Sequence, residues 1–199
     1  MTNFTPKLSA VDIQKVFSND EVNKILNSET YNKQHGLTYS KTKNKFVKTD
    51  YRKVTTYAIR EDDWIKNKIL ESVSQVNVEY WKFSLTGILE NPKIMKYKKD
   101  DKYDWHMDVG DWGELSYVEH MVNMRKISYS ILLNDNFEGG NLNFSHGNFI
   151  SSNKWDNIKT DTIVGTGFFF PSFLRHQVSP VISGTRFVLV GWVHGQPFS

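Results

Sequence analysis

Apolar and polar positions follow two different periods along this chain, and the change falls near residue 80. Before it, Ser18 and Glu21 have the spacing of a helical capping box and predict a helix at about 19–29. An acidic cap at 62 or 63, followed by apolar residues at helical spacing, predicts a second helix through about Ser74. The other elements expected in this part are short strands at 11–16 and 51–59 and an exposed hairpin or loop at 32–50.

From residue 80 onward, apolar residues alternate with polar ones, as they do along strands with one buried face. Turn-forming segments such as Glu138-Gly139-Gly140 separate the apolar runs. The expected strands are 83–90, 93–98, 103–109, 126–133, 141–145, 162–169, 176–181 and 185–194. Two helices followed by about eight strands predict a mostly β fold with N-terminal helices, namely a β-sandwich or a jelly roll buttressed by the two helices.

Length and composition narrow the class of protein. A chain of 199 residues without an internal repeat or linker predicts one domain over 1–199, with helical and strand support over about 1–90 and a β core over about 91–195. No run of about 18 apolar residues and no signal pattern occur, so we expect no membrane span and a cytoplasmic location, in the host cytoplasm if the source is viral. Cysteine is absent, which leaves histidine, aspartate and glutamate to bind any transition metal.

The triplet His106-Met107-Asp108 is the strongest chemical signal in the chain. Residues two apart on a strand point to the same side, so the imidazole and the carboxylate are expected to project together. They are two of the three ligands of a facial triad, which binds non-haem Fe(II) and leaves coordination positions open. A late strand should supply the third ligand, and His176 follows an apolar run there. Ten residues later Arg186 opens another apolar strand, where a guanidinium is costly unless it meets an anion.

Five segments, in order, resemble the 2-oxoglutarate- and Fe(II)-dependent oxygenases, and in particular their prolyl 4-hydroxylase-like branch. The H-x-D triplet is followed after a gap of 67 residues by His176, and after nine more by Arg186. Tyr97 and Tyr103 reproduce the lead-in to the triplet. The other matching segments are 125–134, 138–142, and 176–181 with 184–186. The resemblance is close over about 94–193 and looser over 11–93.

This resemblance implies a double-stranded β-helix, a form of jelly roll, with Fe(II) bound inside one end by His106, Asp108 and His176. The cosubstrate 2-oxoglutarate would chelate the iron and pair its far carboxylate with Arg186, and O2 would take the remaining position. The implied reaction converts 2-oxoglutarate to succinate and hydroxylates an unactivated C–H bond, with ascorbate as a candidate reductant.

The resemblance also orients the strand at 126–133. Its face with Ser128, Ser130 and Leu132 should turn toward the cosubstrate, where the two small side chains would leave room. Leu132 stands where some relatives carry a hydroxyl. The far carboxylate is therefore expected to take its second contact from Tyr97 or Ser128.

Further site residues follow from strand parity and from their nearness to the triplet. The residues that share parity with His176 or Arg186, and should line the same pocket, are Val178 and Trp192. The candidate substrate contacts are Tyr103, Trp105 and Trp112. The connection at 109–124 is either a substrate lid or a disordered link. His194 shares the parity of Arg186, but a structural role is the first expectation for it.

Several functions compete. The prolyl 4-hydroxylase-like pattern favours a peptidyl proline as substrate, and a free amino acid or small metabolite is the second expectation. A net charge of +3 decides nothing about nucleic acid, but a nucleic-acid demethylase is disfavoured because 187–192 lacks a second arginine. Asp108 disfavours a halogenase, and Met107-Asp108 does not fit the H-x-H pattern of a cupin-like metalloenzyme. A non-catalytic jelly-roll binding module stays open, although the complete triad argues against it. The sequence leaves the oligomeric state open.

Overall fold

The computed structural model describes residues 11–35, 37–40, 45–60, 63–109, 123–145, 155–156 and 163–197. The helical elements in this part are α1 (Asn19–Leu26), α2 (Asp63–Val76) and the π-helical turn η1 (Asn77–Trp81). The strands are β1 (Asp12–Lys15), β2 (Thr30–His35), β3 (Leu37–Ser40), β4 (Lys45–Lys48), β5 (Arg52–Lys53), β6 (Thr55–Ile59), β7 (Leu85–Gly87), β8 (Lys93–Tyr97), β9 (Lys102–His106), β10 (Met124–Leu132), β11 (Phe137–Gly139), β12 (Leu142–Ser145), β13 (Trp155–Asp156), β14 (Thr166–Pro171), β15 (His176–Val178), β16 (Val181–Gly184) and β17 (Arg186–Gly195).

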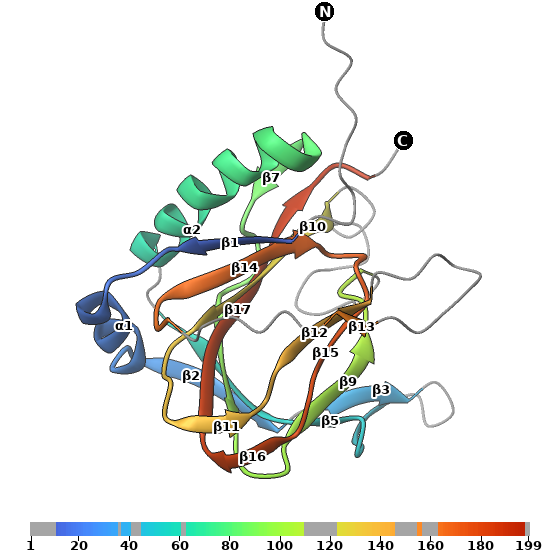
Figure 1. The fold of residues 1–199 in the computed structure, drawn as a ribbon. Coiled ribbons are helices and arrows are strands. Elements are labelled where there is room, and N and C mark those ends of the chain that lie inside the picture. Colours follow the sequence, from blue (N-terminus) through green and yellow to red (C-terminus); the bar gives the residue numbers. More distant parts are fainter. Residues whose placement is uncertain are drawn as a thin grey trace, which may run out of the picture.

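Two antiparallel sheets pack against each other (Figure 1). The larger has the strand order β1-β14-β10-β17-β8-β6-β2, with β7 beside β17, and the smaller has the order β13-β12-β15-β9-β5. From β8 onward the chain alternates between them, because β8, β10, β14 and β17 lie in the larger sheet while β9, β12 and β15 lie in the smaller. This winding confirms the predicted mostly β jelly roll. The division into support and core near residue 90 stays a prediction, and β2 and β6 share a sheet with β8 and β17.

Both predicted helices are present and pack on one side of the larger sheet (Figure 1). The predicted capping box opens α1: the Glu21 N–H donates to Ser18 Oγ at 3.3 Å, and the Ser18 N–H donates to the Glu21 carboxylate at 2.8 Å. The apolar stripes of the helices and the outer face of the sheet form one buried cluster, which includes Val22, Ile25, Ile65, Ile69, Val73, Ile127, Tyr129, Ile131 and Leu189. This cluster holds the larger sheet in place from outside.

A second buried cluster fills the space between the sheets and surrounds the candidate site. Its members include Met95, Tyr97, Leu142, Phe144, Phe168, Phe170, Val178 and Val188. On β10, Ile127 and Tyr129 face the helices, while Leu132 packs against this inner cluster and Ser128 bonds to Asp108. The predicted alternation of faces along this strand is therefore confirmed.

The N-terminal part differs from the expectation at two places. The strand expected at 51–59 divides at Val54 into β5, which pairs with β9 of the smaller sheet, and β6, which pairs with β8 of the larger sheet. The stretch expected as an exposed hairpin does contain the β3–β4 hairpin, but β2 begins at Thr30 and joins the larger sheet through β6. Local polarity did not indicate β2, because a strand at the edge of a sheet gains its hydrogen bonds from a distant partner.

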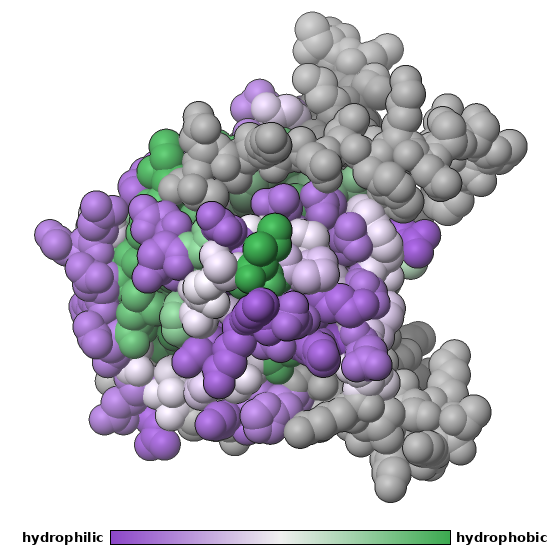
Figure 2. All heavy atoms as spheres, turned by 60° about the horizontal axis from the view of Figure 1, so that its bottom comes forward, coloured by the Kyte–Doolittle hydropathy of each residue, from purple (hydrophilic) through white to green (hydrophobic). Residues whose placement is uncertain are grey.

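Hydrophilic side chains predominate on the face shown in Figure 2, which is the lower end of the molecule in Figure 1, and hydrophobic ones are scattered among them. The exposed large apolar residues belong to separate elements, as Val78, Ile163 and Ile182 illustrate. Within the part of the chain that the structure describes, no helix combines the length and the apolar character that crossing a bilayer requires.

Candidate metal centre

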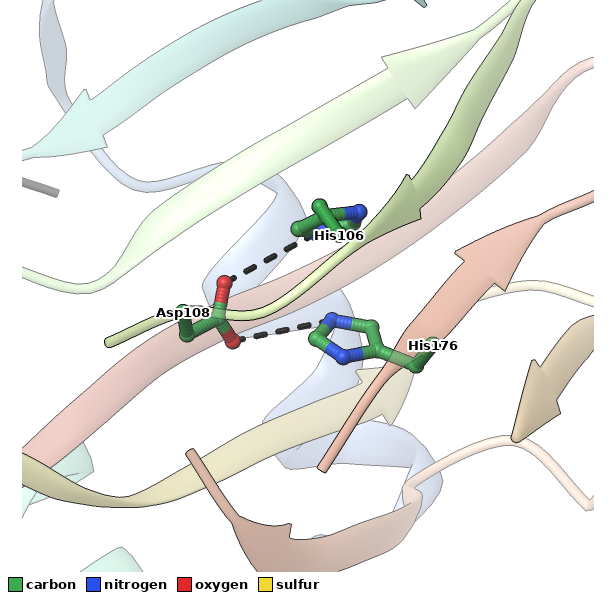
Figure 3. A group of neighbouring side chains, drawn as sticks. All are labelled: His106, Asp108 and His176. Carbon is green, nitrogen blue, oxygen red and sulfur yellow. Dashed lines mark ion pairs between the residues drawn. The ribbon is translucent and has the colours of Figure 1, made fainter. Parts of the chain in front are cut away.

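The three residues of the predicted triad meet at one point (Figure 3). His106 ends β9, Asp108 follows two residues later, and His176 begins the neighbouring strand β15, directly opposite His106 in the register. One ligand atom from each residue lies within 4.8 Å of the others. The carboxylate sits between the rings, with Oδ1 3.7 Å from His106 Nε2 and Oδ2 3.6 Å from His176 Nε2. The cluster therefore has the size and the donor atoms to hold a metal ion.

Backbone carbonyl groups fix the orientation of both imidazoles. His106 Nδ1 donates to the Asp104 carbonyl oxygen at 2.7 Å, and His176 Nδ1 donates to the Leu174 carbonyl oxygen at 2.9 Å. Since a carbonyl oxygen only accepts, the proton of each neutral ring lies on Nδ1. Both Nε2 lone pairs are thereby left to face the common point, as metal-binding histidines require.

Electrostatics keep His106 and Asp108 in the protonation states that bind metal. Burial, together with the neighbouring His176, lowers the pKa of His106 to about 4, so its ring is neutral at neutral pH. Burial by itself would raise the pKa of Asp108, but the two imidazoles and a hydrogen bond from Ser128 outweigh it and lower that pKa. At neutral pH the site thus presents a neutral His106 and an ionised Asp108.

Two serines hold Asp108 in place. Ser128 Oγ donates to Asp108 Oδ2 at 2.6 Å, and the Asp108 main-chain N–H donates to the Ser172 carbonyl oxygen at 2.8 Å. The two serine hydroxyl groups lie 3.0 Å apart, and Ser172 is fully buried. In the structure the Ser128 hydroxyl orients the carboxylate, and its predicted contact with the cosubstrate stays a prediction.

Aromatic rings enclose the two imidazoles. Tyr103 stacks on His106 with 3.6 Å between ring centroids, and the Phe170 ring meets His176 edge-on at 4.7 Å. Strict alternation would put Tyr103 and His106 on opposite faces of β9, but the register with β15 shifts between His176 and Val178. This bulge turns both side chains toward the same side.

Arg186 lies at the start of β17, paired with Tyr97 of β8, and is almost completely buried. Its guanidinium carbon is 5.5 Å from the centroid of the Tyr97 ring and 5.9 Å from that of Phe137. Nη1 has no hydrogen-bond partner among the described residues. Burial lowers the pKa of Arg186 to about 10, which leaves the group charged at neutral pH. A buried cation without an anion is expensive, so this position is suited to an anionic ligand.

One cavity connects the triad with Arg186. It has an empty volume of about 550 Å³, which includes its open mouth. The predicted site residues that line it, besides the triad and Arg186, are Tyr97, Tyr103, Ser130, Val178 and Trp192. Leu132 and Trp105 do not line it. Leu132 packs into the inner cluster, and the Trp105 main-chain carbonyl oxygen accepts a hydrogen bond from the Tyr51 hydroxyl at 2.7 Å. Trp112 lies outside the described residues.

A buried ion pair lies close to the triad, and none of the expectations from the sequence included it. Arg125 donates from Nε and Nη2 to the two carboxylate oxygens of Glu90, at 2.6 Å each, and His194 Nε2 lies 3.3 Å from Glu90 Oε1. All three side chains are buried, which agrees with the structural role expected for His194. A signal was present, since Arg125 lies near the start of a strand that becomes buried, just as Arg186 does.

We expect Glu90 to make the stability of the fold dependent on pH in acid. Burial would raise its pKa, but His194 and Arg125 outweigh burial and lower the pKa from 4.5 to about 2. The ionised carboxylate therefore stabilises the protein above about pH 4.5, and this contribution, on the order of 3 kcal/mol, is lost as the pH falls toward 2. Urea denaturation at about pH 6 and pH 3 should show a smaller change in unfolding free energy for Glu90→Gln than for the wild type.

The matched control is Glu29→Gln, because the side chain of Glu29 is 84% exposed. This variant should keep the pH dependence of the wild type. An equal dependence in all three proteins would contradict the assignment to Glu90.

Solved structures share this fold at low sequence identity. A prolyl-4-hydroxylase from Pseudomonas putida has a TM-score of 0.61 at 14% identity, with 95% of this chain and 94% of that chain covered. A prolyl hydroxylase from Trichoplax adhaerens, in complex with a hypoxia inducible factor peptide fragment, has a TM-score of 0.63 at 18% identity, with 93% and 83% covered. These likenesses confirm the jelly-roll fold.

Curated sequences add two relatives from Synechococcus. PKHD-type hydroxylases of strains CC9902 and CC9605 are each 28% identical to this chain over 113 residues, or 56% of it. The chain spans less than half the length of these relatives, 44% and 45%.

The family model described as the 2OG-Fe(II) oxygenase superfamily matches residues 92–194, just over half of the chain. The matched region begins just before β8 and ends at His194, next to the last residue of β17. It contains the triad and Arg186. The triad and Arg186 also line one cavity in the structure. We therefore conclude that this chain belongs to the 2OG-Fe(II) oxygenase superfamily.

Proposed function

We propose that the chain is a 2-oxoglutarate- and Fe(II)-dependent dioxygenase that hydroxylates an unactivated C–H bond. The observation that carries this proposal is the single cavity with a His-Asp-His cluster on one side and the buried guanidinium of Arg186 on the other. A purely structural metal site would not explain why a buried guanidinium without an anionic partner faces the same cavity.

The residues present fit Fe(II). Two imidazole nitrogens and one carboxylate oxygen are the donor set of the facial triad, and they leave positions open for other ligands. His106, Asp108 and His176 would hold the ion, each of them already oriented by a backbone or serine partner.

The residues present also fit 2-oxoglutarate. Its far carboxylate would give the Arg186 fork the anion that no described side chain supplies. The Tyr97 hydroxyl, which donates to the Met95 sulfur at 3.4 Å, is a candidate for a second contact, because Tyr97 lines the cavity. Burial raises the pKa of Tyr97, so it would act as a neutral donor. Ser130 is small and lines the space between Arg186 and the triad.

Bound together, Fe(II) and 2-oxoglutarate would activate O2, which is the oxidant: one of its oxygen atoms would go to the hydroxyl group of the product and the other to succinate, as 2-oxoglutarate is oxidised to succinate and CO2. The protein's own side chains bind and orient these groups and keep water out. Apolar side chains make up much of the wall, among them Phe170, Val178 and Val188. Such a wall strengthens the pairing of Arg186 with its anion.

For the substrate we propose a peptidyl proline. Two of the structures that share this fold are named as prolyl hydroxylases, and one of them was solved with a peptide. A free amino acid or small metabolite is the second candidate. A cytoplasmic location stays a prediction.

The test is coupled turnover. Purified protein with Fe(II), ascorbate and 2-oxoglutarate should release succinate faster when a proline-containing peptide is added, and mass spectrometry should find one added oxygen atom on that peptide. Stimulation by free amino acids alone would move the assignment to the second candidate. Absence of any metal-dependent binding of 2-oxoglutarate in calorimetry would overturn the enzymatic proposal and leave a binding module.

Gly140 should prove necessary for the anion site. An alanine Cβ there would lie 2.9 Å from Arg186 Cδ and 3.0 Å from Val181 Cγ2, on a residue whose φ is +61°. We expect Gly140→Ala to destabilise the fold by about 1–3 kcal/mol and to weaken 2-oxoglutarate binding, because Arg186 must move. Denaturation and calorimetric titration in the presence of Mn(II) measure the two effects.

Gly87→Ala is the matched control. Gly87 also has a positive φ, +127°, but a Cβ there meets nothing within 4 Å. This variant should lose stability through its backbone and keep the affinity for 2-oxoglutarate. If both variants bind 2-oxoglutarate equally well, the close contact of Gly140 with Arg186 has no functional role.

A further inference from the structure

Behind one wall of the metal cavity lies a buried charged network, formed by Glu90, Arg125 and His194. The Arg125 and Glu90 side chains are 3% and 0% exposed, and His194 is 0% exposed. Lys93 Nζ adds a fourth group, 3.6 Å from Glu90 Oε2. Burying these charges is costly, and an ion pair is often no more stable than apolar residues in the same volume. Stability alone is therefore a weak reason for the network.

Arg125 reaches the metal site through two contacts that its pairing with Glu90 leaves available. Its guanidinium carbon lies 3.6 Å from the centroid of the Trp192 ring, which lines the cavity. Its Nη1 donates to the main-chain carbonyl oxygen of Asp108 at 3.4 Å. One side chain thus touches both the main chain of the carboxylate residue and the indole in the cavity wall.

These contacts complete the support of Asp108. Ser128 holds its carboxylate, Ser172 accepts its N–H, and Arg125 donates to its carbonyl oxygen. Asp108 comes after the end of β9, so the ladder of the smaller sheet does not hold it. A carboxylate at that point depends on such side contacts to stay aligned with the two imidazoles.

We propose that Arg125 is a positioning residue of the metal site, one that aligns Asp108 and Trp192 while Glu90 and His194 hold its guanidinium in place. The inference rests on the proposed function, since it assigns the triad to metal binding. Arginine suits the task because its flat fork pairs with a carboxylate along one edge, stacks on an indole with its face and has a further N–H to donate.

The main test removes both charges together. Glu90→Gln with Arg125→Met removes the two most deeply buried charges together, and Lys93, whose side chain is 15% exposed, keeps contact with water, so the double variant should keep a melting temperature close to that of the wild type. Calorimetric titration with Mn(II) should show metal affinity at least about 10-fold weaker, the loss typical when a partner of a metal ligand is removed. In turnover, the KM for Fe(II) should rise by more than kcat falls.

Two further variants secure the interpretation. Arg125→Lys keeps the charge opposite Glu90 but cannot stack flat and pair with two oxygens at once, so it should fold and still bind Mn(II) more weakly than the wild type. The control is Glu21→Gln with Lys68→Met, which removes an ion pair between the two helices, and it should keep wild-type Mn(II) affinity.

The outcomes separate the two proposals. If the folded double variant binds Mn(II) as tightly as the wild type, only the role of Arg125 is overturned and the proposed function stands. If the double variant does not fold, wild-type affinity in Arg125→Lys has the same meaning. Failure of the wild type to bind Mn(II), or binding that Asp108→Ala leaves unchanged, overturns the proposed function and this inference with it.

Discussion

Replacing Asp108 with alanine is expected to abolish metal-dependent turnover while the protein stays folded. The carboxylate supplies the only anionic donor of the triad, and each of its oxygens faces one imidazole. Loss of a ligand should exceed the 10–100-fold effect of losing one of its outer partners, so we expect Mn(II) affinity to fall by more than about 100-fold. Calorimetry with Mn(II) and succinate release with Fe(II) measure the two consequences.

Asp104→Ala is the matched control for this prediction. Asp104 lies on β9 as well, but its carboxylate is paired with Lys102 Nζ at 2.9 Å and is 37% exposed. The hydrogen bond that it accepts from His106 uses its main-chain carbonyl oxygen, which alanine retains. Asp104→Ala should therefore bind metal normally. If Asp108→Ala keeps its turnover and Asp104→Ala loses it, the assignment of the triad is wrong.

Replacing Arg186 with methionine is expected to weaken 2-oxoglutarate binding and, in the same protein, to raise the thermal stability without ligand. Two hydrogen bonds to a charged group contribute about 3 kcal/mol or more, which corresponds to a roughly 100-fold higher KM for 2-oxoglutarate. The melting temperature should rise because methionine removes a buried cation that has no anionic partner among the described residues. Calorimetric titration and thermal denaturation test the two parts separately.

Arg60→Met is the control for arginine removal in general. Arg60 is 61% exposed, and its ion pair with Glu29 is weak because the two charged atoms are 4.0 Å apart. Neither 2-oxoglutarate binding nor the melting temperature should therefore change much. If Arg186→Met melts at a lower temperature and binds 2-oxoglutarate as well as the wild type, Arg186 is a structural cation and the anion site is wrongly assigned.

Arg186→Met is expected to lower the affinity for 2-oxoglutarate and to raise the melting temperature, and both effects have the same cause. A group that must bind an anion is held ready in the folded protein, without that anion, at a cost in stability. The triad carries less of this cost, because its rings and its carboxylate already have partners in the backbone and in Ser128.

The features that depend on local periodicity and on spacing could be predicted from the order of the residues. The capping box at Ser18 and Glu21, the two helices and the two faces of β10 all follow from side-chain order over a few residues. The H-x-D triplet, His176 and Arg186 could be identified together because their order and spacing match a family, and the structure brings all four to one cavity.

Which distant residues meet became clear from the folded chain and not from any local pattern. Glu90 lies 35 positions from Arg125 and 104 from His194, so no local pattern relates them. The bulge between β9 and β15 turned Tyr103 onto His106, and the hydrogen bond from Ser128 to Asp108 joins residues 20 positions apart. Periodicity states which side of a strand a residue occupies, but its neighbour there depends on how two strands come into register, which is settled by packing across the whole fold.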